Sequence, residues 1–287
     1  MERILAATDF STRSQRALRQ AGLLARQTDA QLTLLHIVDE DQPPHLIQLE
    51  RDEGETILKE QVGSVAELQG IDCRVVVMTG VAFDAILRTA KSVSADLIVM
   101  GAHRKQLLRD IFVGTTIERV VRTASCPVLM VNNEAAHSYS RVLAAVDMSD
   151  ISANAVQSAK ALGFLEHTHL TVVHAFEAMA KGKLFMADVP KERIDDYVAQ
   201  EQQRASAELT TFLQPQLGGA VWSRRVEEGE PLRIISAVAT EIGADLLVIG
   251  THGRTGLAKV LLGSVAEKAL RTLDVDILAV PPVAARG

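Results

Sequence analysis

The chain has 287 residues with 47% hydrophobic but only 3% aromatic side chains, and its formal net charge is -6 at pH 7. This acidic balance argues against a broad nucleic-acid surface, because binding to DNA or RNA depends on Lys and Arg that neutralise phosphates. No apolar run approaches the roughly 20 residues of a membrane helix and no signal-peptide core follows Met1. We therefore expect a cytoplasmic protein that binds neither nucleic acid nor membrane.

The first half of the sequence alternates apolar runs of strand length with helical patterns. Such alternation is typical of βαβ units and of a parallel sheet that is covered on both faces. Strands are predicted at 3–8, 31–37, 73–78, 96–100 and 128–131, and helices at 12–28, 47–69, 83–94 and 115–123.

The second half repeats the first along nearly its whole length. Residues 3–11 return as 141–149, residues 32–36 as 170–174, and residues 95–103 as 244–252. The offset grows from 138 residues (Arg3 to Arg141) to 149 (Ala95 to Ala244), so the second copy carries a net insertion of eleven residues between Glu177 and Gly229. The sequence is a tandem duplication.

The duplication predicts two domains, at 1–135 and 136–287, each near the size at which one hydrophobic core suffices. The polar segment 132–140 is the predicted linker. In the second half we expect a longer second helix near 191–213, and Pro231 at the first turn of the next helix, where proline is tolerated.

A glycine pattern follows the fourth strand of each half. In the second half Gly250-Thr-His-Gly253 is followed after nine residues by Gly263-Ser264-Val265. Glycines let backbone N–H groups approach an anion, and a helix N-terminus offers unpaired donors. Ser264-x-x-Glu267 and Thr115-x-x-Glu118 also have capping-box spacing, so a purely structural cap is the alternative. The position at the carboxyl edge of a parallel sheet favours a nucleotide site.

Together these motifs resemble the universal stress protein family, as a tandem of two UspA-type domains. The resemblance implies two Rossmann-like domains similar to adenine nucleotide alpha hydrolases, each an α/β fold with a five-stranded parallel sheet of order 3-2-1-4-5. It also implies that ATP, with or without Mg2+, binds at the carboxyl edge. In the second half, Asp147 would accept from the adenine amino group and Ala175 would offer backbone to the base, with ribose and phosphates held by Gly250, Gly253, Gly263, Ser264 and Val265. The corresponding first-half residues are Asp9, Ile37, Gly101, Arg104, Gly114, Thr115 and Thr116.

Arg104 departs from this pattern because it stands where the motif has a glycine. The arginine either blocks the backbone approach and fills the pocket, or places a guanidinium on the phosphates. The sequence favours ATP binding in the second half over the first and leaves open whether the first half binds nucleotide.

Three functions remain open. The favoured one is an ATP-binding stress or signalling module that is not an efficient enzyme, with slow hydrolysis or autophosphorylation left unspecified. The second is a nucleotide-free scaffold or small-ligand protein, in which the loop 179–189 binds a partner; that loop could equally cover the nucleotide pocket. The third, an adenylating enzyme, lacks the Ser-Gly-Gly-x-Asp-Ser type loop that such enzymes carry after the first strand.

Other polar residues have structural interpretations. We expect His36 and His174 to be hydrogen-bonded packing residues, and Asp96 and Asp245 to be local caps or ion-pair partners. His103 and His252 could either stabilise their loop or contact ligand. The two cysteines are too few for a disulfide framework, and no metal-ligand spacing occurs. By resemblance to single-domain dimers, the strands 128–131 and 276–280 could pair within the chain as a pseudo-dimer, and a homodimer is a further prediction.

Overall fold

The computed structural model describes residues 1–102, 115–134, 137–252 and 262–282. The first half contains β1 (Arg3–Thr8), α1 (Thr12–Thr28), β2 (Gln31–Val38), α2 (Pro44–Ser64), a short 3-10 helix (Ala66–Leu68), β3 (Cys73–Thr79), α3 (Ala82–Ser92), β4 (Leu97–Gly101), α4 (Thr116–Thr123) and β5 (Val128–Val131). The second half contains β6 (Arg141–Ala145), α5 (Asp150–Ala161), β7 (His169–Phe176), α6 (Lys181–Met186), α7 (Lys191–Leu217), β8 (Ser223–Glu228), α8 (Pro231–Ile242), β9 (Leu246–Gly250), α9 (Ser264–Thr272) and β10 (Asp276–Val280).

The described strands form one sheet of order β3-β2-β1-β4-β5-β10-β9-β6-β7-β8. Within each half the strands are parallel, and their order confirms the predicted 3-2-1-4-5 arrangement. The halves join where β5 pairs antiparallel with β10, with Ile277 opposite Met130. This contact confirms that the last strands pair within the chain, and it buries two strand edges that would otherwise be open.

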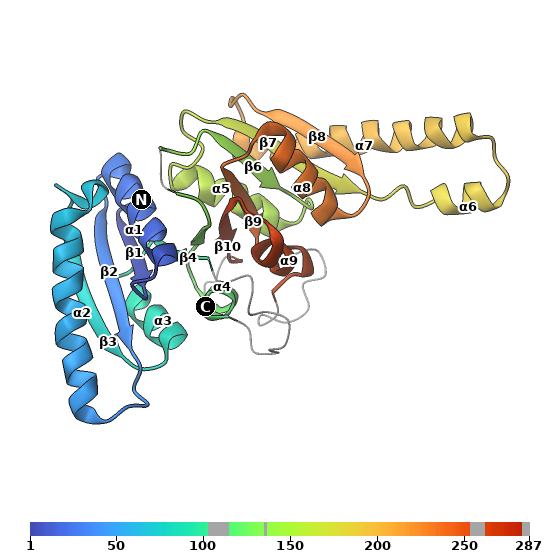
Figure 1. The fold of residues 1–287 in the computed structure, drawn as a ribbon. Coiled ribbons are helices and arrows are strands. Elements are labelled where there is room, and N and C mark those ends of the chain that lie inside the picture. The colour runs from blue at the N-terminus through green and yellow to red at the C-terminus, as the bar shows by residue number, and fades with distance from the viewer. Residues whose placement is uncertain (103–114, 135–136, 253–261, 283–287) are drawn as a thin grey trace, which may run out of the picture.

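Helices cover both faces of the sheet, which runs through the middle of the molecule (Figure 1). On one face the core includes Leu18 of α1, Leu58 of α2 and Leu209 of α7. On the other it includes Ile86 of α3 and helical residues of α4, α8 and α9. Each core contains residues of both halves, so the apolar packing continues across the β5–β10 junction.

Two predictions need correction, one for the bounds of a helix and one for a segment expected to be a loop. The helix predicted at 47–69 begins earlier, at Pro44, and ends at Ser64, where Val65 becomes extended and a short 3-10 helix follows. Proline is accepted at a helix start because its missing N–H would have no partner there. The segment 179–189, predicted as a loop, contains the helix α6.

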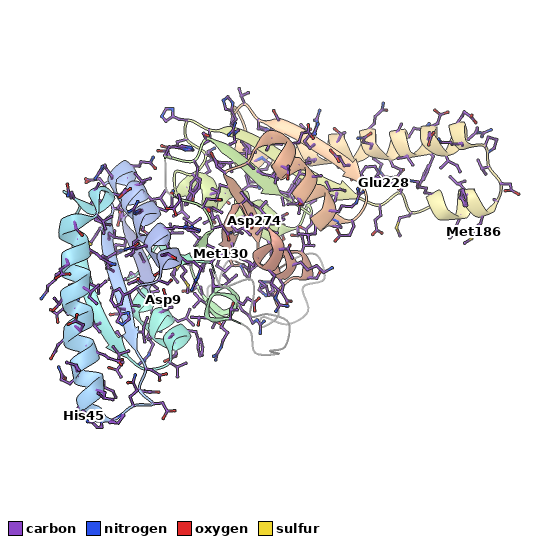
Figure 2. All side chains as sticks on the ribbon, viewed as in Figure 1. Asp9, His45, Met130, Met186, Glu228 and Asp274 are labelled. Carbon is purple, nitrogen blue, oxygen red and sulfur yellow. The ribbon has the colours of Figure 1, made fainter. Side chains whose placement is uncertain are left out.

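The eleven-residue insertion builds an arm. It is formed by α6 and by the outer part of α7, which has 27 residues against 21 in α2, and it projects beyond the body of the molecule (Figure 1). Met186 lies at the outer end of this arm and Glu228 near its base (Figure 2). Lys181 pairs with Glu228 at 2.5 Å, and the Ala180 N–H donates to the Tyr197 hydroxyl at 3.2 Å. The first contact ties α6 to the end of β8, and the second ties its start to α7.

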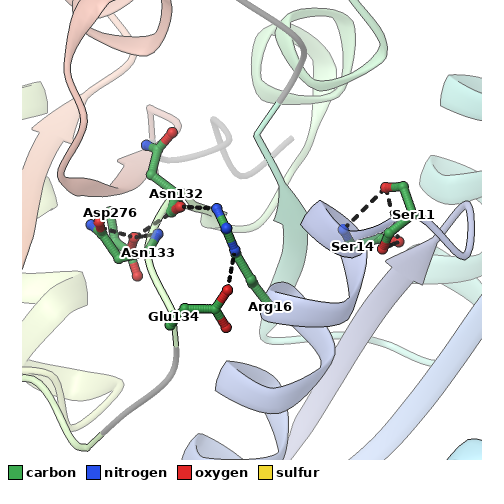
Figure 3. A network of polar contacts seen from close by, with 7 residues as sticks. All are labelled: Ser11, Ser14, Arg16, Asn132, Asn133, Glu134 and Asp276. Atoms are coloured by element: carbon green, nitrogen blue, oxygen red, sulfur yellow. Dashed lines mark hydrogen bonds and ion pairs between the residues drawn. The ribbon is translucent and has the colours of Figure 1, made fainter.

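Asp276, at the start of β10, anchors the segment that connects the halves (Figure 3). Its carboxylate accepts from the backbone N–H groups of Asn132 and Asn133 at 2.8 and 3.0 Å and from the Tyr139 hydroxyl at 2.7 Å. Burial raises the pKa of Asp276 above its ordinary value, although these hydrogen bonds oppose the shift. Burial and the nearby Asp276 charge also raise the pKa of Tyr139.

Arg16 of α1 makes a second tie to the same segment. Its guanidinium donates to the Asn132 carbonyl at 3.0 Å and pairs with Glu134 at 2.6 Å (Figure 3). The predicted linker is thus held, at its described residues, by both halves of the chain.

Candidate functional site

Two cavities lie at the carboxyl ends of the strands, at matching places in the two halves. The first has a volume of about 360 Å³ and the second of about 280 Å³. Of the predicted site residues, the first cavity is lined by Asp9, Ile37, Gly101, Thr115 and Thr116. The second is lined by Asp147, Ala175, Gly250, Gly263, Ser264 and Val265. The fold therefore brings these predicted residues together around one cavity in each half.

Three predicted site residues lie outside the described part of the chain: Arg104, Gly114 and Gly253. His103 lies outside it as well.

The turn after the first strand has the same geometry in both halves. The Asp9 Oδ1 atom accepts from the Ser11 hydroxyl at 2.5 Å and from its N–H at 3.0 Å. The Asp147 Oδ1 atom accepts from Ser149 at 2.6 and 3.1 Å. This is an Asx-turn, in which a carboxylate bonds backbone two residues ahead.

The middle residue of each turn and its serine complete this arrangement. Phe10 and Met148 adopt left-handed conformations, with φ of 60° and 59°. Ser11 and Ser149 also accept from N–H groups in the first turns of α1 and α5, so each serine caps a helix as well. The sequence analysis named Asp9 and Asp147 as site residues but did not predict that this turn fixes the orientation of the aspartate.

The environment of Asp9 favours its charged form. Burial opposes ionisation, but hydrogen bonds from Ser11 and Ser14 and the positive charge of Arg13 together hold the pKa of Asp9 below its ordinary value. The first cavity therefore carries a carboxylate at neutral pH.

Gly101 and Gly250 serve a packing role that differs from the one predicted. A Cβ atom at Gly101 would lie 2.6 Å from the Arg13 carbonyl oxygen, and one at Gly250 would lie 2.9 Å from the Ile151 Cγ2 atom. Both glycines thus let the fourth strand pass close to the first turn of a helix, α1 or α5. The close approach that requires glycine is to the protein itself.

The helix starts at the two cavities differ, although their sequences have the same spacing. Thr115 is the N-cap of α4 and forms the predicted capping box: its N–H donates to the Glu118 carboxylate at 3.1 Å and its hydroxyl accepts from the Glu118 N–H at 3.4 Å. The predicted box at Ser264 is wrong. The N-cap of α9 is Gly263, and no side chain among the described residues caps this helix.

Arg271 of α9 contacts both glutamates, Glu118 and Glu267. Its Nε atom donates to the buried Glu118 carboxylate at 2.6 Å, across the junction between the halves. Its Nη2 atom pairs with Glu267 at 2.9 Å and also lies 3.3 Å from the second Glu118 oxygen. Glu118 therefore bonds both to its own helix start and to Arg271, whereas Glu267 bonds to Arg271 and does not cap α9. The hydrogen bond from Arg271 to Glu118 raises the pKa of Arg271.

His252 lines the second cavity and has a buried ring nitrogen without a hydrogen-bond partner among the described residues. Its Nδ1 atom lies 2.9 Å from the Thr251 hydroxyl, while its buried Nε2 atom has no hydrogen-bond partner among the described residues. Buried polar atoms without partners are rare, and a ligand is one way to satisfy them.

The other predicted polar residues have structural roles. The Nδ1 atoms of His36 and His174 lie 3.0 and 2.9 Å from the carbonyls of Thr8 and Val146, which supports their interpretation as packing residues. Asp96 accepts from two backbone N–H groups at the start of β1. Asp245 does the same at the start of β6, where it accepts from Ser140 and Arg141. Each aspartate thus ties the fourth strand of its half to the first.

Neither cysteine is among the described residues that line the cavities. Both are half-buried free thiols, and burial raises the pKa of each to about 11. Within the described ranges, no three His, Cys, Asp or Glu side chains gather in a way that could hold a metal ion. None of the described helices has the length and apolar character needed to cross a membrane.

Comparison with known proteins gives a consistent picture. The pattern of the Universal stress protein family matches residues 1–132 and 138–281. A universal stress protein of Mycobacterium tuberculosis is 26% identical over 289 residues, which cover 96% of this chain and 95% of that protein. Universal stress protein E of Escherichia coli is 26% identical over 206 residues, which cover 70% of this chain and 65% of that protein. The crystal structure of a universal stress protein from Archaeoglobus fulgidus aligns with a TM-score of 0.71 at 20% identity, over 97% of this chain and 98% of that one, and so shares its fold.

Proposed function

The chain belongs to the universal stress protein family, and on that premise we propose that it is a stress-response or signalling module that binds ATP in its second cavity. The observation that carries the proposal is the uncapped start of α9, which faces a cavity that also holds Asp147 and Ala175. A helix start without a cap offers N–H groups and the positive end of the helix dipole to an anion.

The base end of the second cavity suits adenine. Asp147 is held by its turn to Ser149, and a carboxylate has about four acceptor sites, which leaves capacity for the adenine amino group. Apolar side chains such as Val173, Ile235 and Ile249 also line this cavity and would contact the flat faces of a base. A carboxylate acceptor distinguishes an amino purine from one that carries a carbonyl at the same position.

The phosphate end is built from the start of α9. The Gly263 N–H already donates to the Thr251 carbonyl at 2.7 Å, which fixes the turn into the helix. The N–H groups of Ser264 and Val265 follow it in the first helical turn, where N–H groups lack intrahelical partners. The exposed Ser264 hydroxyl makes no cap bond, and the His252 Nε2 atom is buried nearby. We propose that this set of donors holds phosphate oxygens, with or without Mg2+.

The proposed activity is binding, with changes in partner choice as its consequence, and not rapid turnover. Phosphoryl transfer needs a group that positions the attacking nucleophile and a cationic clamp on the transferred phosphate. The described lining of the second cavity offers His252 and Ser264 but no arginine or lysine.

Calorimetric titration of nucleotide-stripped protein with Mg-ATP tests the proposal. We expect saturable binding that Asp147→Ala weakens at least tenfold, because the base loses its polar contact. Asp9→Ala is the matched control, since it removes the same turn in the first half and should leave ATP affinity within twofold. Absence of ATP binding by the wild-type chain would overturn the proposal.

One observation favours a second function, that of a scaffold. Met179, Phe185 and Met186 on the arm are 82%, 76% and 88% exposed, and clustered apolar side chains of this size are typical of interaction surfaces. None of 179–189 is among the described residues that line the second cavity, so the arm is better placed to contact a partner than to cover ATP. The double variant Phe185→Ser with Met186→Ser should abolish capture of a protein partner by the immobilised chain and leave ATP titrations unchanged.

A further inference from the structure

We infer that Arg13 makes the first cavity a site for an adenine nucleoside monophosphate, whose phosphate the guanidinium binds. The inference rests on the proposed function for the recognition of the base by an aspartate, but it concerns the other cavity and a residue outside the glycine pattern. It follows from the two charged side chains that line the first cavity and from the residue that replaces one of them in the second half.

Arg13 brings a positive charge to the first cavity. It lies in the first turn of α1 and lines the cavity together with Asp9. Among the described residues that line the first and second cavities, Arg13 is the only arginine or lysine. An arginine stays charged at neutral pH, and its planar group suits bidentate contact with a phosphate. The first cavity therefore holds a side chain that can bind an anion.

The second half has an apolar residue at the matching position. Arg13 and Ile151 each stand two residues after the serine of the Asp-x-Ser turn. A Cβ atom on the glycine that ends β4 would lie 2.6 Å from the Arg13 carbonyl oxygen, and one on the glycine that ends β9 would lie 3.4 Å from the Ile151 carbonyl oxygen. Both residues thus lie beside the end of the fourth strand, where the glycine pattern begins, but only the first half has a charge there.

The Arg13 guanidinium makes no hydrogen bond or ion pair with the part of the chain that the structure describes. Arg16 of the same helix differs, because it donates to the Asn132 carbonyl and pairs with Glu134. The charge of Arg13 acts on the Asp9 carboxyl, whose pKa it helps to lower. The positive charge is therefore felt inside the cavity and stays available to a ligand.

The base end of the first cavity has the same turn as the second. A carboxylate has about four acceptor sites, and the hydrogen bonds that Asp9 accepts from Ser11 and Ser14 leave capacity for one more donor, such as an adenine amino group. Ile37 and Met100 also line this cavity and would contact the faces of the base. A nucleotide could thus place its base on the aspartate and its phosphate on the arginine.

The charges that line the first cavity favour one phosphate over three. Asp9 is ionised at neutral pH, so it and Arg13 leave the described lining without net charge. A phosphate on the guanidinium forms a charge-assisted pair. Each further phosphate adds negative charge for which the described lining holds no second cation. We therefore expect the first cavity to prefer AMP to ATP.

Calorimetric titrations of the Asp147→Ala chain isolate the first cavity, because this variant removes the polar base contact of the second. In magnesium-free buffer at pH 7.5, AMP should bind at one site per chain. Its affinity should be at least tenfold higher than that of adenosine, the usual scale for hydrogen bonds to a charged group, and higher than that of ATP. Absence of AMP binding, equal affinities for AMP and adenosine, or tighter binding of ATP would overturn the inference.

The variant Arg13→Met, made in the same Asp147→Ala chain, assigns the phosphate contact to this side chain. It should weaken AMP binding at least tenfold and leave adenosine within twofold, because only the phosphate loses a partner. Asp9 stays ionised in this variant, since its hydrogen bonds from Ser11 and Ser14 lower its pKa more than Arg13 does. Unchanged AMP affinity in a folded variant would overturn the inference.

Arg19→Met is the matched control, because Arg19 is an exposed arginine of the same helix and is not among the described residues that line the cavity. It should leave AMP affinity within twofold, and a loss equal to that of Arg13→Met would reveal a general charge effect and contradict the inference.

The two proposals fail separately. Wild-type binding of Mg-ATP that depends on Asp147, together with AMP binding that ignores Arg13→Met, would overturn this inference and leave the proposed function intact. A wild type that binds no ATP but binds AMP through Arg13 would overturn the proposed function and leave this inference standing.

Discussion

The two cavities share the turn after their first strands but differ at the start of their last helices. In the first half a threonine and a glutamate form a reciprocal cap on α4. In the second half α9 has Gly263 as its N-cap, so Glu267 is not at the capping-box position and pairs with Arg271 of the same helix. The comparison teaches that the same motif spacing can start a helix at different residues, at Thr115 in one half and at Gly263 in the other, and so give different caps.

The largest effect that we predict concerns a residue with no counterpart in the first half. Asp276 stands where the first half has Pro127, and it accepts from Asn132, Asn133 and Tyr139. Asp276→Ala should lower the free energy of unfolding by about 3 kcal/mol, since hydrogen bonds to a buried charged group are lost and their donors stay buried. Urea unfolding measures this loss, and Asp276→Asn, which keeps an acceptor oxygen, should lose less than half as much. A loss within 0.5 kcal/mol of zero for the alanine variant, roughly that of a neutral surface change, would contradict the proposed anchor.

The next comparison is between the two glycines that end the fourth strands. Gly101→Ala should cost about 1–3 kcal/mol, typical of overpacking, because the new Cβ meets the Arg13 backbone carbonyl. Gly250→Ala should cost less, because the Cβ meets the end of the Ile151 side chain, which can rotate away. Urea midpoints of the two variants give the order, and equal losses would show that both contacts are equally rigid.

A smaller effect separates the two helix starts directly. Thr115→Ala removes an N-cap that accepts from the Glu118 N–H and should cost about 1 kcal/mol. Ser264→Ala should leave the stability of the ligand-free chain nearly unchanged, since this hydroxyl makes no cap bond. Thermal unfolding of both variants is the measurement; a comparable loss at Ser264 would mean that this serine also caps its helix.

The smallest effect that we predict is a dependence on pH that has opposite signs at two aspartates. The pKa of Asp9 is lowered in the folded chain, so its contribution to stability is present above the unfolded pKa of 3.8 and is lost as pH falls through the folded pKa. The pKa of Asp276 is raised, so the folded chain gains stability as pH falls from the folded pKa toward 3.8.

The direction of each pH effect is measured by comparing the wild type with a variant in which the aspartate is replaced by asparagine, which does not titrate. The stability difference between wild type and Asp9→Asn should shrink on acidification, and that between wild type and Asp276→Asn should grow in favour of the wild type. Urea unfolding between pH 7 and pH 3 follows both, and parallel trends would refute the assignment of opposite shifts.

Most of the strands could be predicted from the sequence pattern, and the strand order was implied by the resemblance to the family. The segments 3–8 and 128–131 consist mostly of aliphatic residues and have the length of strands, and the structure confirms their predicted bounds. The helix predicted at 47–69 was wrong at both ends, because local patterns do not record that Val65 turns the chain into a short 3-10 helix. The helix α6 was missed because its stability depends on contacts with Tyr197 and Glu228.

The sequence by itself determined the duplication and the α/β class, because these depend on periodicity and on repeated motifs, and its resemblance to the family implied the residues that gather at each cavity. Only the tertiary structure decided how the two halves differ in chemistry. The contact of Arg271 with Glu118 joins residues 153 positions apart, and it forms because β5 and β10 pair antiparallel and so bring α4 and α9 together. A bond across that distance leaves no local pattern, and so it could be seen only in the folded chain.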